Sequence, residues 1–392
     1  MVPAARLRAT YFVLYVGVGA SIPYLSAYMR GLGFSGAQIG LAQMIPPALA
    51  PAVALAWAAW SDRHGSPVDG LKRAALIAGA AGLALPFART PVALALALAA
   101  VALGDRAIIP LLDAVTLEAS RRGGPPYASI RLWGSIGFCV SALTVGRALA
   151  ARGEQPGDPL VPAVMSAAFL GYAALLGSLP RTAPPAHAAR PGRRDLLALG
   201  RDRTLLLFFL ACLAHWTAIG PYHLLFGVLV RERGLPSDVT GLAMTAGVVA
   251  EILVMLAAPR LERRFSPRAL LATAFAVSAL RWLLTARATD GTALVLLQLG
   301  HGLTFGLFWA TAMASLGVLV PAPLRATGQA ILTAVLAAAN AIAFLAAGKL
   351  YDLAGSAAPL FGWAAALELG AALVALGALG PLAGRRAAAL GP

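Results

Sequence analysis

Charged side chains are scarce in this chain of 392 residues: only 12% are Asp, Glu, Lys or Arg, whereas 59% are hydrophobic. No ordinary soluble domain approaches this balance, so a soluble globular fold is excluded. Cysteine is almost absent too. Because Cys139 and Cys212 both fall within apolar runs, they imply no disulfide framework.

Catalytic and cofactor-binding motifs are missing as well. The sequence has no Walker loop, no G-x-S-x-G, H-E-x-x-H or C-x-x-C motif, and no pair of histidines at metal-ligand spacing. We therefore expect neither an ATP-driven pump nor an enzyme, and neither a cofactor nor a metal site. A membrane-embedded enzyme or a receptor is the alternative from a different class of protein.

Long apolar runs are what the chain does contain, and between residues 10 and 380 they alternate with short loops that carry arginine. A helix needs ~20 apolar residues to cross the hydrocarbon core of a bilayer. Unbroken runs of this length exclude the strands of a barrel. The sequence therefore predicts an all-α membrane protein. Its twelve transmembrane helices are expected at residues 10–29, 38–60, 74–89, 92–117, 129–150, 160–179, 204–230, 238–257, 268–287, 292–319, 326–347 and 358–380.

The net charge of +15 could suggest a nucleic-acid partner, but the basic residues lie between the apolar runs rather than on one face. With loops assigned alternately to the two sides of the membrane, the side of the amino terminus carries 21 Lys and Arg residues and the opposite side carries 8. Basic loops stay in the cytoplasm. We therefore expect no nucleic-acid partner, a location in the cell (inner) membrane, and both termini in the cytoplasm.

The sequence also divides into two similar halves. A polar segment from Pro180 to Arg203, rich in Pro, Ala and Arg, predicts an amino-terminal six-helix bundle at 1–180, a cytoplasmic linker at 181–203 and a carboxy-terminal six-helix bundle at 204–392. The acid–arginine pairs Asp62-Arg63 and Glu262-Arg263, 200 residues apart, follow the second helix of each half. Two parallel six-helix repeats are the architecture of major facilitator transporters, whose substrate site lies between the halves.

Several short segments carry a resemblance to that superfamily. Asp62, Arg63 and Gly65 resemble its cytoplasmic loop signature, a gating motif in which the acid caps helix ends, although such a pair is also a common topogenic charge. The segment 127–138, YASIRLWGSIGF, is similar to the fifth helix of lactose-permease-like proton symporters and of phenylpropionate permeases. The segments 247–251, 279–282 and 298–301 resemble the phenylpropionate permeases more closely.

In the first half, the ionisable residues within the apolar runs define a candidate substrate site. Arg106 and Asp113 are seven residues apart and share one helix face, either as a structural salt bridge or as substrate ligands. The resemblance to the lactose permease implies that Asp113 and Arg131 bind substrate, unless Arg131 is only a cytoplasmic charge. Phe138 stands where that family has a stacking tryptophan, so a galactoside is disfavoured while a ring-bearing substrate is retained.

In the second half, Glu251 lies near the middle of its run, where a carboxylate must be protonated or face a cation. Arg281 is the expected partner, either in a proton-coupling pair or in a permanent structural one. The spacing from Arg281 to His301 resembles the coupling network of the lactose permease, but the glutamate expected three residues after His301 is Thr304 here. His215 and Tyr222 are weaker candidates for substrate contact.

Together these residues predict a secondary transporter that works by alternating access. We expect proton-coupled uptake of a small organic solute. The resemblance to the phenylpropionate permeases implies an aromatic carboxylate, and Arg106, Arg131 and Arg281 would suit such an anion. A sugar or nucleoside proton symporter and a drug exporter are the alternatives. The expected partners are the solute, protons and membrane lipids, with the protein as a monomer. The roles of Asp105 and Glu368 stay open.

Overall fold

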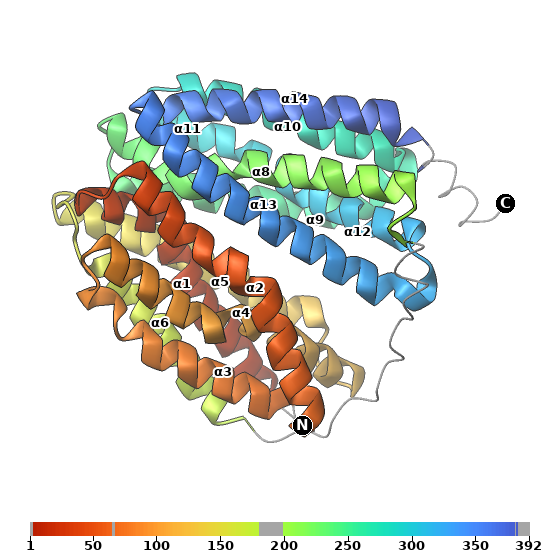
Figure 1. Ribbon diagram of the computed structural model, residues 1–392, viewed down its shortest axis with the longest axis horizontal. Coiled ribbons are helices and arrows are strands. Elements are labelled where there is room, and N and C mark those ends of the chain that lie inside the picture. Colours follow the sequence, from red (N-terminus) through yellow and green to blue (C-terminus); the bar gives the residue numbers. More distant parts are fainter. Residues whose placement is uncertain (1–2, 65–66, 180–198, 381, 383–392) are drawn as a thin grey trace. The chain divides into compact units, whose positions relative to one another are not determined.

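Helices make up most of the described part of the chain, which in the computed structural model comprises residues 3–64, 67–179, 199–380 and 382. Within these residues no strand occurs, and twelve helical segments are long and apolar enough to cross a membrane, with mean hydropathies of 1.2 to 2.2. Each segment overlaps one of the twelve expected runs, and the helices are labelled in Figure 1. The α-helices are α1 (Ala4–Gly31), α2 (Gly36–His64), α3 (Pro67–Gly82), α4 (Pro91–Arg121), α5 (Tyr127–Ala151), α6 (Leu160–Gly177), α8 (Arg203–Glu232), α9 (Ser237–Arg264), α10 (Pro267–Arg287), α11 (Gly291–Leu297), α12 (Phe308–Leu319), α13 (Arg325–Ala354) and α14 (Ala358–Ala378).

Several helices extend beyond the runs that predicted them. The first begins at Ala4 rather than at residue 10, and α13 continues to Ala354 rather than ending at residue 347. Apolarity marks only the stretch within the hydrocarbon core, whereas the helix continues through the interfacial layer. Polar N-caps define other ends: the side chains of Thr90, Ser266 and Asp290 each accept a hydrogen bond from the third backbone N–H that follows.

The tenth expected run, 292–319, is not one regular helix. It consists of α11, a 3₁₀ turn η2 (Gln298–Gly300), a π-helical segment η3 (Gly302–Leu307) and α12. A π turn contains one more residue per hydrogen-bonded ring than an α turn and is often found at functional sites. The irregular segment carries His301 and Thr304, two polar residues of the second half.

Two compact units can be described in this chain. The first contains residues 1–186, 223–245 and 344–355, and the second contains residues 187–222, 246–343 and 356–392, within the described ranges. The first unit thus joins α1–α6 to the end of α8, the start of α9 and the end of α13. The expected bundles, 1–180 and 204–392, stay a prediction, and most of the expected linker lies outside the described residues.

Close helix contacts in the first unit depend on glycine. Helix α1 packs against α5 and α6, and α4 packs against α2 and α3. A methyl group at Gly19 or Gly137 would overlap the backbone of the facing helix in the α1–α5 contact, and one at Gly104 would overlap α3. Small residues allow such close approach in lipid, where packing rather than the hydrophobic effect drives helix association.

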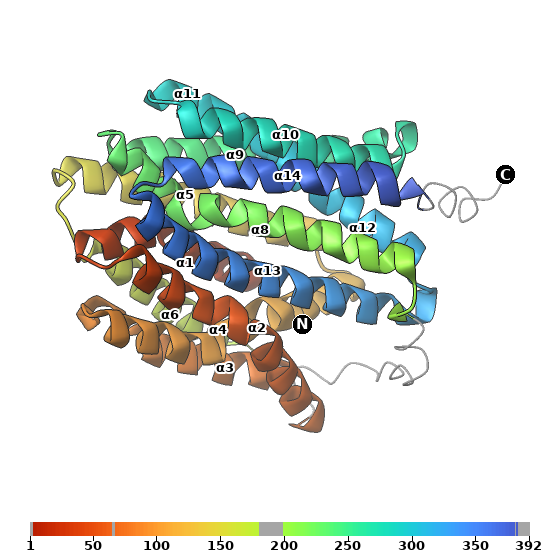
Figure 2. The same cartoon turned by 45° about the horizontal axis from the view of Figure 1, so that its top comes forward.

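In the second unit, α10 is the central helix and packs against α14, η3 and α12. Figures 1 and 2 both show α10 and α14 lying side by side. Gly302 lies against the backbone carbonyl of Ala250, and Gly306 lies against Glu251, which holds η3 close to α9. These contacts bring together α9, η3, α10 and α14, each of which carries polar residues of the second unit.

Candidate functional site

A first polar cluster, which we call the tyrosine cluster, consists of Tyr11, Tyr15, Asp113, Tyr127 and Arg131. The hydroxyl of Tyr11 on α1 donates a hydrogen bond of 2.5 Å to Oδ1 of Asp113 on α4, and the hydroxyl of Tyr127 on α5 donates one of 3.0 Å to the same oxygen. The guanidinium of Arg131 lies 4.3 Å from the ring centre of Tyr15 and 5.5 Å from that of Tyr11, and it donates a hydrogen bond to the Tyr15 hydroxyl.

Helix geometry explains why these five side chains meet. Tyr11 and Tyr15 lie four residues apart on α1, as do Tyr127 and Arg131 on the first turns of α5, so each pair shares a helix face. Asp113 and Arg131 both contact Tyr11: Asp113 accepts a hydrogen bond from its hydroxyl, and Arg131 lies over its ring. The cluster therefore combines a carboxylate acceptor, a forked donor and aromatic faces, which are the groups that bind hydroxyl-bearing rings.

Arg106 shares a helix with Asp113 but forms its ion pair outside this cluster. Its guanidinium pairs with the neighbouring Asp105, whose other oxygen accepts a hydrogen bond of 3.2 Å from the hydroxyl of Tyr172 on α6. The Arg106 side chain is 39% exposed and that of Asp105 is 9% exposed. This arrangement assigns Asp105, whose role the sequence left open, as the counter-charge of Arg106.

Phe138, the other sequence-predicted residue of the first half, is buried on α5, two turns beyond Arg131. Its backbone lies at the crossing with α1, next to Gly19. In the gating motif, Arg63 is exposed at the end of α2. Nothing is described of the Asp62 side chain, and Gly65 lies outside the described residues, so that motif stays a prediction.

A second polar cluster, which we call the arginine cluster, surrounds Arg281 in the second unit. Its guanidinium donates a hydrogen bond of 2.8 Å to Oγ1 of Thr304 and another to the side chain of Gln298, and its Nη1 lies 3.3 Å from Nδ1 of His301. The rings of Tyr222 and Trp282 flank it at 4.7 and 4.2 Å. Arg281 is 3% exposed, so this charge is held almost entirely by hydrogen bonds and aromatic faces.

Glu251 reaches this cluster through His301. Its Oε2 lies 3.8 Å from Nε2 of His301, on the opposite side of the ring from the nitrogen that faces Arg281. The sequence led us to expect Arg281 itself as the counter-charge of Glu251, and the structure brings the imidazole of His301 between them. Because a guanidinium only donates, Nδ1 of His301 is the acceptor toward Arg281, and Nε2 carries the hydrogen that faces Glu251.

Two further polar residues of this unit form a buried pair that the sequence did not predict. His215 on α8 and Glu368 on α14, both 0% exposed, are joined by hydrogen-bond distances of 2.9 and 2.8 Å from Nδ1 to the two carboxylate oxygens. His215, expected as a substrate contact, thus has its ring enclosed by Glu368, Phe275 and Phe308. Tyr222, expected as a polar wall of the substrate site, is buried against Trp282 and His301.

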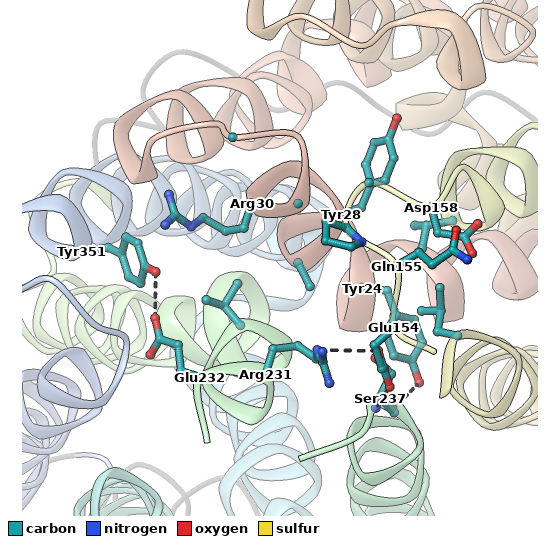
Figure 3. Close-up of a pocket in the computed structure, with 18 residues that line it drawn as sticks. Tyr24, Tyr28, Arg30, Glu154, Gln155, Asp158, Arg231, Glu232, Ser237 and Tyr351 are labelled. Atoms are coloured by element: carbon teal, nitrogen blue, oxygen red, sulfur yellow. Dashed lines mark hydrogen bonds and ion pairs between the residues drawn. The ribbon is translucent and has the colours of Figure 1, made fainter. Parts of the chain in front are cut away.

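A polar pocket of about 480 Å³ lies in the first unit, at the end of the helices that bear Arg30 and Arg231 (Figure 3). Glu154, which follows α5, accepts hydrogen bonds of 2.5 and 2.6 Å from the backbone nitrogen and the hydroxyl of Ser237, the first residue of α9. It also lies 3.5 Å from Nε of Arg231. Glu154 adopts a left-handed backbone with φ of 55°, which is uncommon for a residue other than glycine.

A matching cap lies at the same end of the unit. Asp352, in the last turn of α13, accepts hydrogen bonds of 2.6 and 2.8 Å from the backbone nitrogens of Gly36 and Ala37, the first residues of α2. Its neighbour Tyr351 donates a hydrogen bond of 2.7 Å to Glu232 (Figure 3). We call the contacts Glu154–Ser237 and Asp352–Gly36 the paired caps. Each satisfies free N–H groups at a helix start with a carboxylate, which also complements the helix dipole.

Comparisons with known proteins agree with this architecture. The MFS_1 like family matches residues 4–361. The maltose permease of Geobacillus stearothermophilus is 31% identical over 329 residues, which cover 83% of this chain and 82% of that protein. The probable 3-phenylpropionic acid transporter of Escherichia coli (strain K12) is 26% identical over 320 residues, covering 78% and 80%. The crystal structure of the nucleoside transporter NupG superimposes with a TM-score of 0.83 at 17% identity, over 95% of this chain and 98% of that one, and so shares the fold.

Proposed function

Because this chain belongs to the MFS_1 like family, as the resemblance to the major facilitator superfamily predicted, we propose that it takes up a neutral, hydroxyl-bearing solute of the sugar or nucleoside class together with protons. The chain is a multi-pass membrane transporter. We further propose that it resides in the inner membrane as a monomer with both termini in the cytoplasm, as the distribution of basic loops favours.

The tyrosine cluster is the observation that carries the substrate class. Asp113 provides an acceptor, Arg131 a forked donor, and Tyr11 and Tyr15 aromatic faces. A ring with several hydroxyl groups uses all three, since each hydroxyl can donate and accept. The charges of the acid and the base balance, so a neutral solute enters without leaving either charge uncompensated.

The same charge balance weakens the case for an anionic solute, which the sequence had favoured. Arg106 is matched by Asp105, and Arg131 shares Tyr11 with Asp113. A carboxylate solute would therefore meet a carboxylate in the tyrosine cluster. An aromatic carboxylate is the second candidate, supported by the likeness to the probable 3-phenylpropionic acid transporter, whereas the likeness to a maltose permease at higher identity supports the first.

Glu251, His301 and Arg281 are the residues we propose for proton coupling. The acid is 21% exposed, and the imidazole beside it connects to a buried arginine that keeps its charge. A carboxylate that is paired with His301 in one state and protonated in another binds and releases one proton per cycle. In lactose-permease-like symporters a glutamate three residues after the histidine releases the proton. That residue is Thr304 here, so we propose that Glu251 or His301 releases the proton instead.

Alternating access is supported by the paired caps. Each joins a residue of the first half of the sequence to one of the second half at the end bearing Arg30 and Arg231, which the charge count assigns to the outside. Both sets of hydrogen bonds must break if the solute is to enter from that side. The caps are therefore proposed as the external gate, closed in this structure.

Uptake by purified protein in proteoliposomes tests the proposal. The panel comprises radiolabelled maltose, uridine and 3-phenylpropionate, each with and without an imposed inward pH gradient. We expect uptake of maltose or uridine, with accumulation only under the gradient. Uptake of 3-phenylpropionate alone would replace the first candidate with the second. Equal uptake with and without the gradient would remove proton coupling from the proposal.

A further inference from the structure

The buried His215–Glu368 pair lies deeper than the residues proposed for coupling and has its own fixed geometry. Nδ1 of His215 faces both oxygens of Glu368, while Nε2 lies 3.0 Å from the backbone carbonyl oxygen of Thr304. Glu368 also accepts a hydrogen bond of 3.4 Å from Nε1 of Trp282. Neither side chain is exposed, so no bulk water shares these hydrogen bonds.

Hydrogen-bond chemistry fixes how many protons the pair holds. A backbone carbonyl only accepts, so Nε2 of His215 carries a hydrogen. If Nδ1 carried none, its lone pair would face a carboxylate ion at less than 3 Å with no proton between them. One proton must therefore lie between Nδ1 and Glu368, either on the imidazole as an ion pair or on the carboxyl in a neutral pair. In both forms the net charge is zero.

The same histidine holds the irregular part of the tenth membrane segment. Thr304 belongs to the π-helical segment η3, and its carbonyl receives the Nε2–H of His215. A side-chain donor at a break in the helical ladder stabilises that break. The side chain of Thr304 in turn accepts the hydrogen bond from Nη1 of Arg281. Thr304 therefore links the buried pair to the arginine cluster through two different atoms.

Charge balance connects Glu368 with Glu251. Besides His215 itself, the charged or titratable groups near Glu368 are Arg281, in electrostatic contact with it, and beyond it His301 and Tyr222. The side chains of Trp282 and Ser278 also face Glu368, and Phe275 and Phe308 lie against His215. While the pair keeps its proton and is neutral, the charge of Arg281 is available to His301 and Glu251. If the pair lost its proton, its negative charge would compete for the same guanidinium.

We propose that His215 and Glu368 form a second proton-holding site, and that they position Arg281 for coupling by holding Thr304 and the π-helical segment. The proposal rests on the proposed proton coupling. The proton that leaves the pair is accepted by Glu251: once the pair is negative it draws the charge of Arg281 toward Glu368, the counter-charge of Glu251 weakens, and the two acids together keep the same number of protons. His215 and Glu368 are positioning residues, since neither touches the solute in this argument.

The variant Glu368→Gln tests the role in coupling because it preserves shape and hydrogen bonds. Its amide can donate to Nδ1 of a neutral His215 but has no proton to exchange. We expect normal folding and normal equilibrium exchange of the panel solute that the wild type transports. We also expect about a tenfold loss of accumulation under a pH gradient, within the usual range of coupling energies, and a flattened dependence of uptake on pH.

Thr311→Val is the matched control, because it removes from the same membrane segment a buried hydroxyl that makes no hydrogen bond within the described part of the chain. It should behave as the wild type does. Wild-type accumulation and pH dependence in Glu368→Gln would overturn the proposal and leave the pair as a structural tie between α8 and α14. Glu368→Asp, which keeps the exchangeable proton on a shorter side chain, should recover part of the pH dependence that the glutamine variant loses.

A second measurement needs neither a solute nor a folded variant at position 368. In wild-type protein labelled with ¹⁵N-histidine in nanodiscs, the His215 signal should show a protonated Nε2 at every pH from about 5 to 9, near the ordinary range of histidine titration. A hydrogen on Nδ1 with a bare Nε2 would overturn the proposal. If wild-type uptake ignores the pH gradient, proton coupling fails, while this signal still decides whether Nε2 of His215 donates to Thr304 and so holds the π-helical segment.

Discussion

Glu154 and Asp352 occupy corresponding positions in the two halves of the sequence, 198 residues apart, and each caps a helix of the opposite half. The residues they cap, Ser237 and Gly36, are 201 residues apart. The basic side chains nearby repeat as well: Arg30 bonds the carbonyl of Phe34, and Arg231 bonds that of Leu235. The internal repeat suggested by the acid–arginine pairs thus recurs in three-dimensional contacts at the other end of the helices.

The paired caps should contribute independently to the free energy that keeps the proposed external gate closed. Loss of one charged cap costs ~1 kcal/mol, so Glu154→Gln and Asp352→Asn should each shift the closed-to-open ratio about fivefold, and the double variant about 25-fold. Spin labels at the exposed positions Phe87 and Thr289 would report the change as a longer distance distribution. Asp158→Asn is the control, since Asp158 bonds Arg152 and the start of α6 within one half. An unaltered distribution in both cap variants would show that the caps do not hold the gate.

Neutralising Glu251 should separate binding from coupling. Glu251→Gln imitates the protonated acid permanently, so the variant should still exchange solute at equilibrium but should not concentrate it in response to a pH gradient. Arg281→Ala should be more damaging, because it leaves Gln298, Thr304 and His301 without their shared donor. Proteoliposome uptake beside equilibrium exchange measures both. Glu118→Gln, which neutralises an exposed acid paired with Arg122, should leave both activities unchanged, and gradient-driven accumulation by Glu251→Gln would exclude that acid as the coupling site.

Substitutions in the tyrosine cluster should act on solute affinity. Asp113→Asn keeps one acceptor but removes the charge that holds two tyrosine hydroxyls, and Arg131→Lys removes the fork and the planar contact with Tyr15. Each should raise the KM about tenfold, since a hydrogen bond to a charged group contributes ~1.5 kcal/mol. Initial rates of uptake over a range of solute concentrations give the KM. A matched Arg122→Lys change on the surface should have no effect, and an unchanged KM in both cluster variants would place the solute elsewhere.

The orientation in the membrane can be tested by labelling single cysteines from outside intact cells. Because the basic residues favour a cytoplasmic linker, Arg190→Cys should escape an impermeant maleimide. Gln155→Cys, exposed in the loop after α5, should react. Permeabilised cells provide the control in which both should react. The opposite pattern would invert the topology and move the paired caps to the cytoplasmic side.

The twelve membrane segments could be predicted because a bilayer imposes a length and a composition on each run separately. Contacts between side chains of different membrane segments are harder to predict, because no such constraint fixes which segments meet. Arg281 and His301 lie on successive segments at a spacing similar to that of a known family, and the structure brings them together. His215 and Glu368 are 153 residues apart, and no local pattern relates α8 to α14. Only the presence of an acid in an apolar helix indicated that Glu368 has a partner.

The choice of partners in the first half illustrates the same limit. Arg106 and Asp113 share a helix face by periodicity, which predicted a common role. In the structure Arg106 pairs with its neighbour Asp105, and Asp113 binds tyrosines from α1 and α5. Periodicity gives the direction of a side chain but not which neighbouring helix supplies the group it meets. The tyrosines were missed because Tyr11 and Tyr15 resemble any aromatic residues of a membrane helix.

The π-helical segment η3 has a consequence for how the tenth membrane segment is read. Successive residues of an α-helix are rotated by ~100° about its axis, so one extra residue in a turn rotates everything after it by that angle relative to what comes before. The faces of α11 and α12 consequently follow two different helical phases. Deleting one residue from Gly302–Leu307 would rotate α12 by about that angle relative to α11 and turn it away from the surface it now presents to α10. Comparisons of this segment with related chains should therefore align α11 and α12 as two separate blocks, one on each side of η3.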